Sequence, residues 1–163
     1  MEFRSIESFK YYIKCVSKLT NMTESESLKT YFNILLLSRL SQYNFEKFIV
    51  LGDASNFATT SSLTNPILNL DLAVENTKSY IPFIKTILEY TNNEIKFEIV
   101  EEEITESDTN LVVLASYEKL SRLISIGLHK QELDLKNAVV KNIKPIHDKT
   151  CPFGVVVEKG LSR

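Results

Sequence analysis

The sequence has no tryptophan and is poor in the residues that build metal centres and disulfide frameworks, with two cysteines and two histidines among 163 residues. Cys15 and Cys151 form neither a CxxC pair nor a spacing typical of metal ligands. His129 and His147 do not form the i, i+4 pair that binds zinc on a helix. The sequence therefore predicts neither a metal nor a cofactor.

Glycine is also scarce, with four residues in the chain. The dinucleotide fingerprint G-x-G-x-x-G is absent. A phosphate loop needs several glycines and a lysine followed by Ser or Thr, and no lysine lies between Lys47 and Lys78, where a strand-end loop is expected. The sequence therefore argues against both kinds of nucleotide-binding loop.

The segment Gly52-Asp53-Ala54-Ser55 follows an apolar run, at the place where some enzymes hold a nucleophile. A nucleophile elbow requires G-x-S-x-G, and Ser55 lacks those glycines. We interpret the segment as a strand-end turn in which Asp53 bonds its own loop. The alternative is a small hydrolase that uses Ser55 or Cys151 with His147.

Long apolar runs and a leader-like start are absent as well. No stretch approaches the eighteen or so apolar residues of a membrane span. Residues 1–5 do not resemble a secretory signal. With four prolines and four glycines the chain offers little linker sequence, so we expect one compact domain over residues 1–163, cytoplasmic and without membrane association.

Two amphipathic stripes open the chain. The first predicts a helix over about residues 5–19, with Ser5 as its N-cap. Thr23 and Glu26 have the spacing of a capping box and predict a second helix that ends near Tyr43. The short link between them indicates an antiparallel helical hairpin.

The rest of the chain alternates between short apolar runs and turn residues. We expect a loop over 54–65, a helix capped at Ser79 and another helix from Ser116 to Gly127. The predicted strands cover about 48–51, 68–74, a pair within 94–115, 138–143 and 153–157. The fold class is α+β: an N-terminal helical hairpin followed by a mostly antiparallel sheet with two further helices.

Charge is distributed unevenly. Residues 94–108 hold seven of the 21 acidic side chains and a single base, Lys96. Such a cluster attracts a basic partner without providing defined catalysis. The candidate partner-binding residues are Glu98, Glu101, Glu102, Glu103, Glu106 and Asp108.

These observations favour a binding protein over an enzyme. The chain carries a net charge of −2 and its lysines are interspersed with acids, so nucleic acid is not an expected partner. The most concrete hypothesis is a small immunity or inhibitor protein that neutralises a basic, nuclease-type toxin through its acidic surface. The alternatives are a chaperone-like adaptor for an exported effector and the small hydrolase described above.

Overall fold

The computed structural model of the chain describes residues 5–42, 48–60, 65–89, 95–131, 138–146 and 154–161. The helices in these ranges are α1 (Ile6–Thr20), α2 (Glu24–Gln42), α3 (Gly52–Thr60) and α4 (Thr77–Glu89). The strands are β1 (Phe48–Leu51), β2 (Asn69–Val74), β3 (Ile95–Ile104), β4 (Asp108–Tyr117), β5 (Leu120–Lys130), β6 (Ala138–Ile146) and β7 (Gly154–Leu161). The fold is α+β, as the sequence predicts.

The N-terminal helices begin where their capping residues place them. The Oγ of Ser5 accepts a hydrogen bond from the backbone N–H of Ser8 and caps α1. Thr23 and Glu26 form the reciprocal capping box of α2, with both side chain to backbone distances at 3.0 Å. The cap and the box both satisfy backbone donors that have no partner inside the helix. The predicted helical pair is therefore confirmed.

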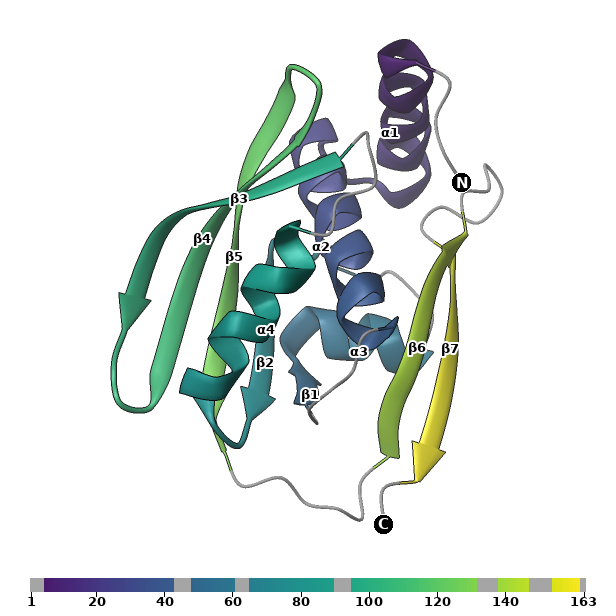
Figure 1. The fold of residues 1–163 in the computed structure, drawn as a ribbon. Helices are drawn as coiled ribbons and strands as arrows, with labels where there is room; N and C mark the ends of the chain where they lie inside the picture. Colours follow the sequence, from purple (N-terminus) through teal and green to yellow (C-terminus); the bar gives the residue numbers. More distant parts are fainter. Residues whose placement is uncertain are drawn as a thin grey trace.

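Five strands form one sheet in the order β1-β2-β5-β4-β3. All neighbours in it are antiparallel except β2 and β5, which run parallel with Asn69 opposite Ser125 and Asp71 opposite Gly127. β6 and β7 form a separate antiparallel pair, seen at the right of Figure 1. The parallel contact joins residues far apart in the sequence, and it sets the geometry of the site described below.

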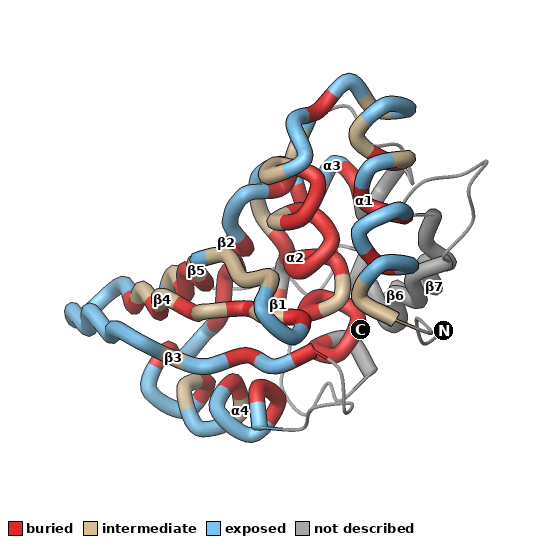
Figure 2. The backbone as a smooth tube through the Cα atoms, turned by 90° about the horizontal axis from the view of Figure 1, so that it is seen from above, coloured by how far each residue is buried: buried red, intermediate tan, exposed pale blue. Residues whose placement is uncertain are grey.

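Helices α1, α2 and α4 pack on one face of the sheet. Aromatic contacts make this connection: Phe9 of α1 stacks on Tyr117 of β4 at 4.5 Å between ring centroids. Tyr80 of α4 meets Phe48 of β1 edge to face at 6.2 Å. Figure 2 shows the buried residues concentrated between these helices and the strands. Along these strands buried apolar side chains alternate with more exposed ones. The opposite face of the sheet carries the polar side chains of this alternation.

Three predictions of local structure are wrong. Residues 116–127 form the β4–β5 hairpin instead of a helix, and α3 occupies most of the predicted loop at 54–65. Helix α4 is present but is capped by Asn76, whose Oδ1 accepts from the backbone N–H groups of Lys78 and Ser79. Pro82 consequently falls in the second turn of the helix, one turn later than a cap at Ser79 implies.

No helix among the described residues is long and apolar enough to cross a membrane.

Candidate functional site

Alternation along the strands separates an apolar face from a polar one. On β2, Leu70 and Leu72 are buried, while Asn69 is exposed and Asp71 is half-buried. On β5, Ile126 is buried beneath the helices, and the residues on either side of it point the other way. The polar side chains of both strands consequently share the open face of the sheet.

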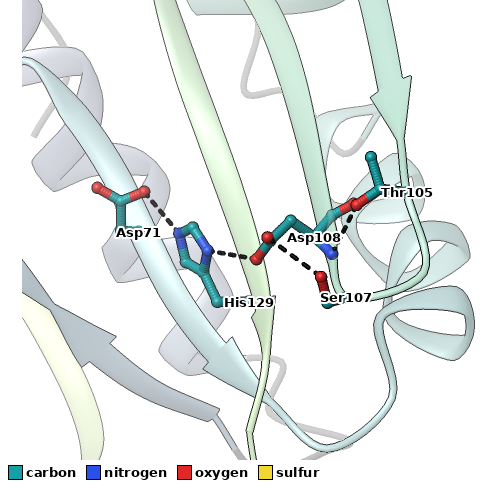
Figure 3. Close-up of polar contacts among 5 residues, drawn as sticks. All are labelled: Asp71, Thr105, Ser107, Asp108 and His129. Carbon is teal, nitrogen blue, oxygen red and sulfur yellow. Dashed lines mark hydrogen bonds and ion pairs between the residues drawn. The ribbon is translucent and has the colours of Figure 1, made fainter.

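We call the polar group on this face the open-face cluster; its members are Asn69, Asp71, Asp108, Ser125 and His129. They come from β2, β4 and β5, the three adjacent central strands. Figure 3 shows His129 between the carboxylates of Asp71 and Asp108, with the helices behind the strands. Nε2 of His129 lies 3.0 Å from Oδ1 of Asp71, and Nδ1 lies 2.8 Å from Oδ1 of Asp108.

A histidine donates from both ring nitrogens only when it is protonated. Hydrogen bonds from the imidazole to Asp71, and then to Asp108, raise the pKa of His129 above its ordinary value of 6.5, and the attraction of both carboxylates acts in the same direction. Partial burial of the imidazole, whose side chain is 41% exposed, acts in the opposite direction without reversing the shift. The arrangement therefore favours an imidazolium that neutralises two carboxylates.

Gly127 makes the contact between His129 and Asp71 possible. It lies directly opposite Asp71 in the parallel register. A Cβ on residue 127 would overlap Oδ1 of Asp71 and stand 3.0 Å from Nε2 of His129. A glycine in mid-strand costs conformational entropy, and here it leaves space for the ion pair.

Asp108 is held by the turn between β3 and β4. Its backbone N–H donates to Oγ1 of Thr105 at 3.1 Å, and its carbonyl accepts from the N–H of Thr105 at 2.8 Å. Oγ of Ser107 lies 3.3 Å from the second carboxylate oxygen of Asp108. The turn fixes the carboxylate that orients His129.

A hollow of about 380 Å³ adjoins the cluster at the start of β2 and is lined by Asp53, Asn65, Pro66, Leu68 and Asn69. The Nδ2 of Asn65 donates to Oδ1 of Asp53 at 3.3 Å, and the Oγ of Ser125 lies 2.8 Å from Oδ1 of Asn69. Leu51, the last residue of β1, pairs with Asp71. The start of α3 is therefore brought next to the polar start of β2.

The side chains of the hollow and of the open-face cluster offer mainly oxygen atoms, which are the ligands that magnesium prefers. Within the described ranges, no three His, Cys, Asp or Glu side chains are placed to hold a metal ion together. Magnesium in phosphate-transfer sites needs one or two carboxylates, with the other ligands from phosphates and water. The oxygen donors present would supply only part of the coordination shell of such an ion.

Comparison with known proteins identifies the fold. No protein-family model matches the sequence, and no curated protein sequence is significantly similar to it. Among solved structures, the MenT4 nucleotidyltransferase toxin of Mycobacterium tuberculosis superimposes with a TM-score of 0.63, 12% identity, and coverage of 89% of this chain and 52% of the toxin. A Helicobacter pylori protein provisionally described as a nucleotidyltransferase gives a TM-score of 0.50 at 10% identity, covering 84% of this chain and 55% of that one.

The chain shares its fold with these two proteins. It spans about half the length of the structures that it matches. The expectation of a non-enzymatic immunity protein or adaptor is wrong, because these fold neighbours are nucleotidyltransferases and one of them is itself a toxin. Net charge and clustered acids, on which that expectation rested, describe a surface and carry no information about the fold.

The fold neighbours give the hydrolase alternative no support. Ser55 lies in α3 and is half-buried, and Asp53 occupies the first turn of that helix. His147 and Cys151 lie outside the described residues. Cys15, on α1, is a half-buried free thiol.

The predicted partner-binding acids fall into two groups. The first group is exposed on β3, the edge strand of the sheet, and consists of Glu98, Glu101, Glu102 and Glu103. The pairing of β3 with β4 shifts in register between Ile99 and Glu101, within this group. Glu102 pairs with Lys85 of α4 at 2.8 Å. Glu106 lies in the following turn, whereas Asp108 belongs to the open-face cluster. Binding of a basic protein at the exposed acids stays a prediction.

The helix predicted from Ser116 to Gly127 placed His129 just beyond a helix end, and the partners of His129 were missed. A signal was present in residues 124–128, where apolar residues at even positions alternate with serine and glycine. That pattern is typical of a strand with one small or polar face, and a glycine within it indicates close approach by a neighbour. The identity of that neighbour, Asp71, depends on strand order.

Proposed function

We propose that the chain is a nucleotidyltransferase that binds a nucleoside triphosphate beside the open-face cluster and transfers its nucleotidyl group to a hydroxyl group. The observation that carries this proposal is the likeness to the Mycobacterium tuberculosis toxin, which extends over 89% of the chain. The polar groups of β2 and the start of α3 support it, because they meet at one edge of the sheet.

The N-terminus of α3 is suited to the triphosphate. Gly52 has φ of +67°, which lets the chain turn from β1 directly into the helix. The first N–H groups of a helix have no partner within it and point outward, so they bind phosphate oxygens with the help of the helix dipole. Asn69 lines the same hollow as Asp53 and can orient the sugar or the base.

In the proposed reaction the oxygen of the acceptor hydroxyl forms a bond to the α-phosphorus. The bond from the α-phosphorus to the oxygen that bridges to the β-phosphate breaks, and pyrophosphate leaves with that oxygen. Asp71 is placed to accept the hydroxyl proton, since its second carboxylate oxygen points away from His129 in Figure 3. His129 and Asp108 hold the carboxylate in this orientation.

Magnesium enters this reaction as part of the substrate, because nucleoside triphosphates carry it in solution. It neutralises charge that develops on the phosphate oxygens. Asp71 and Asp53 are the carboxylates next to the proposed triphosphate position and would share the ion with the phosphates. The cytoplasm, where such nucleotides are abundant, fits as the location of the protein.

Label transfer tests the proposal. The protein is incubated with each of four nucleoside triphosphates labelled at the α-phosphate, together with magnesium and total RNA and protein from the native cell. The same nucleotides labelled at the γ-phosphate serve as the control. Nucleotidyl transfer puts the α-label, and not the γ-label, on a macromolecule or on a small acceptor resolved by chromatography. Transfer of the γ-label alone indicates a kinase and contradicts the proposal, as does transfer of neither label from any of the four nucleotides.

A further inference from the structure

A second pocket lies in the helical layer, on the other side of the sheet from the open-face cluster. Its volume is about 470 Å³. It is bounded by α1, the start of α2 and the start of β5, and its lining residues are Glu7, Lys10, Tyr11, Ile13, Lys14, Glu24, Leu28, Leu120 and Arg122. On β5, Arg122 has the same parity as the buried Ile124 and Ile126, so it lies on the helical face. The pocket is therefore separate from the proposed transfer site.

Three cations surround this pocket. Within the described residues, Lys10, Lys14 and Arg122 form no ion pair, although Glu7 and Glu24 line the same space. Arg122 is held in place, because its Nε donates to Oγ of Ser25 at 3.1 Å and its Nη1 to the carbonyl of Ser121 at 2.7 Å. A guanidinium oriented in this way presents its other terminal nitrogen, Nη2, to an anion without further loss of side-chain freedom.

The remaining lining supplies an aromatic ring and an apolar floor. Tyr11 is 56% exposed at the pocket, and Ile13 and Leu28 are buried beneath it. A ring at the rim with apolar side chains below is suited to a flat base, which gains from stacking irrespective of its identity. The pocket also has the volume of an ordinary small-ligand site.

We infer that this pocket binds a nucleotide. Lys10, Lys14 and Arg122 meet its phosphate, because charge-assisted hydrogen bonds to phosphate oxygens are the strongest polar contacts such side chains make. Tyr11 stacks on the base. Glu7 and Glu24 accept from the ribose hydroxyls, the role that acidic residues take in other nucleotide sites. The nucleotide is either free or one unit of a single strand, since both present the same groups. The inference does not rest on the proposed transfer activity.

Photochemical labelling tests this site in the full chain. The probes are 8-azido adenosine monophosphate and a short single-stranded RNA that carries one photoreactive base. We expect at least one probe to label the α1 peptide that contains Tyr11. The double variant Lys14→Gln, Arg122→Gln should reduce that label by about tenfold or more, because charged hydrogen bonds are lost. Labelling by the mononucleotide identifies a free ligand, and labelling by the RNA alone identifies a strand.

The matched control is Lys18→Gln, which removes an exposed lysine from the same helix outside the pocket lining and should leave the label unchanged. Thermal melting of all variants shows whether they fold alike. The inference is overturned if neither probe labels α1, or if the label is the same in the double variant as in the wild type. Asp71→Asn separates the two proposals, because it should leave the α1 label intact even where transfer is lost.

Discussion

The Nε2 of His129 stands 3.0 Å from Oδ1 of Asp71, a residue 58 positions earlier in the chain. The parallel pairing of β2 with β5 brings them together, and Asp108 on β4 holds the imidazole from its other nitrogen. Three strands thus supply one connected polar group on the open face of a sheet whose fold is shared with the MenT4 nucleotidyltransferase toxin.

The pKa of His129 is the first quantity to measure. The sequence has two histidines, so NMR spectra of the wild type and His129→Gln assign both ring signals. We expect the pKa of His129 to lie above 6.5, because Asp71 and Asp108 stabilise its charged form. Asp108→Asn and Asp71→Asn should each lower it, with the larger fall for Asp71→Asn. A pKa at or below 6.5 in the wild type contradicts the paired arrangement.

The raised pKa also makes stability depend on pH. The pKa of His129 in the folded protein lies above its value of about 6.5 in the unfolded chain. The stabilisation of the folded state by the His129 ion pairs is therefore fully present below about pH 6.5 and is lost as the pH rises through the folded pKa. Because the imidazole is 41% exposed, water screens its ion pairs, and we expect them to contribute less than about 1 kcal/mol to the free energy of unfolding. Urea unfolding at pH 6 and pH 9, wild type against His129→Gln, measures it. An equal loss of stability in both proteins between these pH values assigns the effect to other groups.

Gly127→Ala tests the close approach at the cluster. The new methyl group would overlap Oδ1 of Asp71, and the short side chain must move away. Because the displaced atom lies at the end of a half-buried side chain that can rotate toward solvent, we expect a stability change within about 1 kcal/mol. The pKa of His129 should fall toward 6.5, and transfer should decrease.

Gly52→Ala is the matched control for this substitution. Its Cβ meets nothing within 4 Å, but φ is +67°, so the variant should lose about 1 kcal/mol through backbone strain. The pKa of His129 should stay as in the wild type. A Gly127→Ala protein whose His129 pKa is unchanged shows that the glycine is not needed for the ion pair.

Thr23→Ala tests the start of α2. The substitution removes the Oγ1 that accepts from the N–H of Glu26 and should cost about 1 kcal/mol in the free energy of unfolding. Adding Glu26→Ala should cost less than the sum of the two single variants, because the two side chains form one reciprocal box. Strict additivity in chemical denaturation would mean that the two bonds act separately.

Local structure was predicted well where the sequence shows both the capping or turn residues of an element and its apolar periodicity. The capping box at Thr23 and Glu26 and the alternation in residues 68–74 gave α2 and β2 nearly as they are. The β4–β5 hairpin was missed because its turn, Glu118-Lys119, contains none of the usual turn residues, and Glu118 takes φ of +52° without being glycine or asparagine. With no turn signal, the run after Ser116 resembled a helix.

The site was harder to predict than the fold class. Alternation tells which face of a strand a residue occupies, but it does not tell which strands are neighbours. Asp71, Asp108 and His129 meet only because β5 lies between β2 and β4, and the parallel β2–β5 contact could not be inferred from an otherwise antiparallel pattern. Asp108 was counted among the acids of residues 94–108. The other described acids of that set lie elsewhere on the surface; they are Glu98, Glu101, Glu102, Glu103 and Glu106.

The most direct test of the account compares Asp71→Asn with Glu98→Gln in the α-label transfer assay. Both variants replace a carboxylate with its amide on the same sheet, but Glu98 is exposed on the edge strand outside the open-face cluster. The account predicts a fall in transfer of about 100-fold or more for Asp71→Asn, the size expected when a group that acts at the reacting atoms is lost. It predicts wild-type transfer for Glu98→Gln. Transfer that survives in Asp71→Asn, or that falls equally in both variants, would contradict a nucleotidyltransferase site at the open-face cluster.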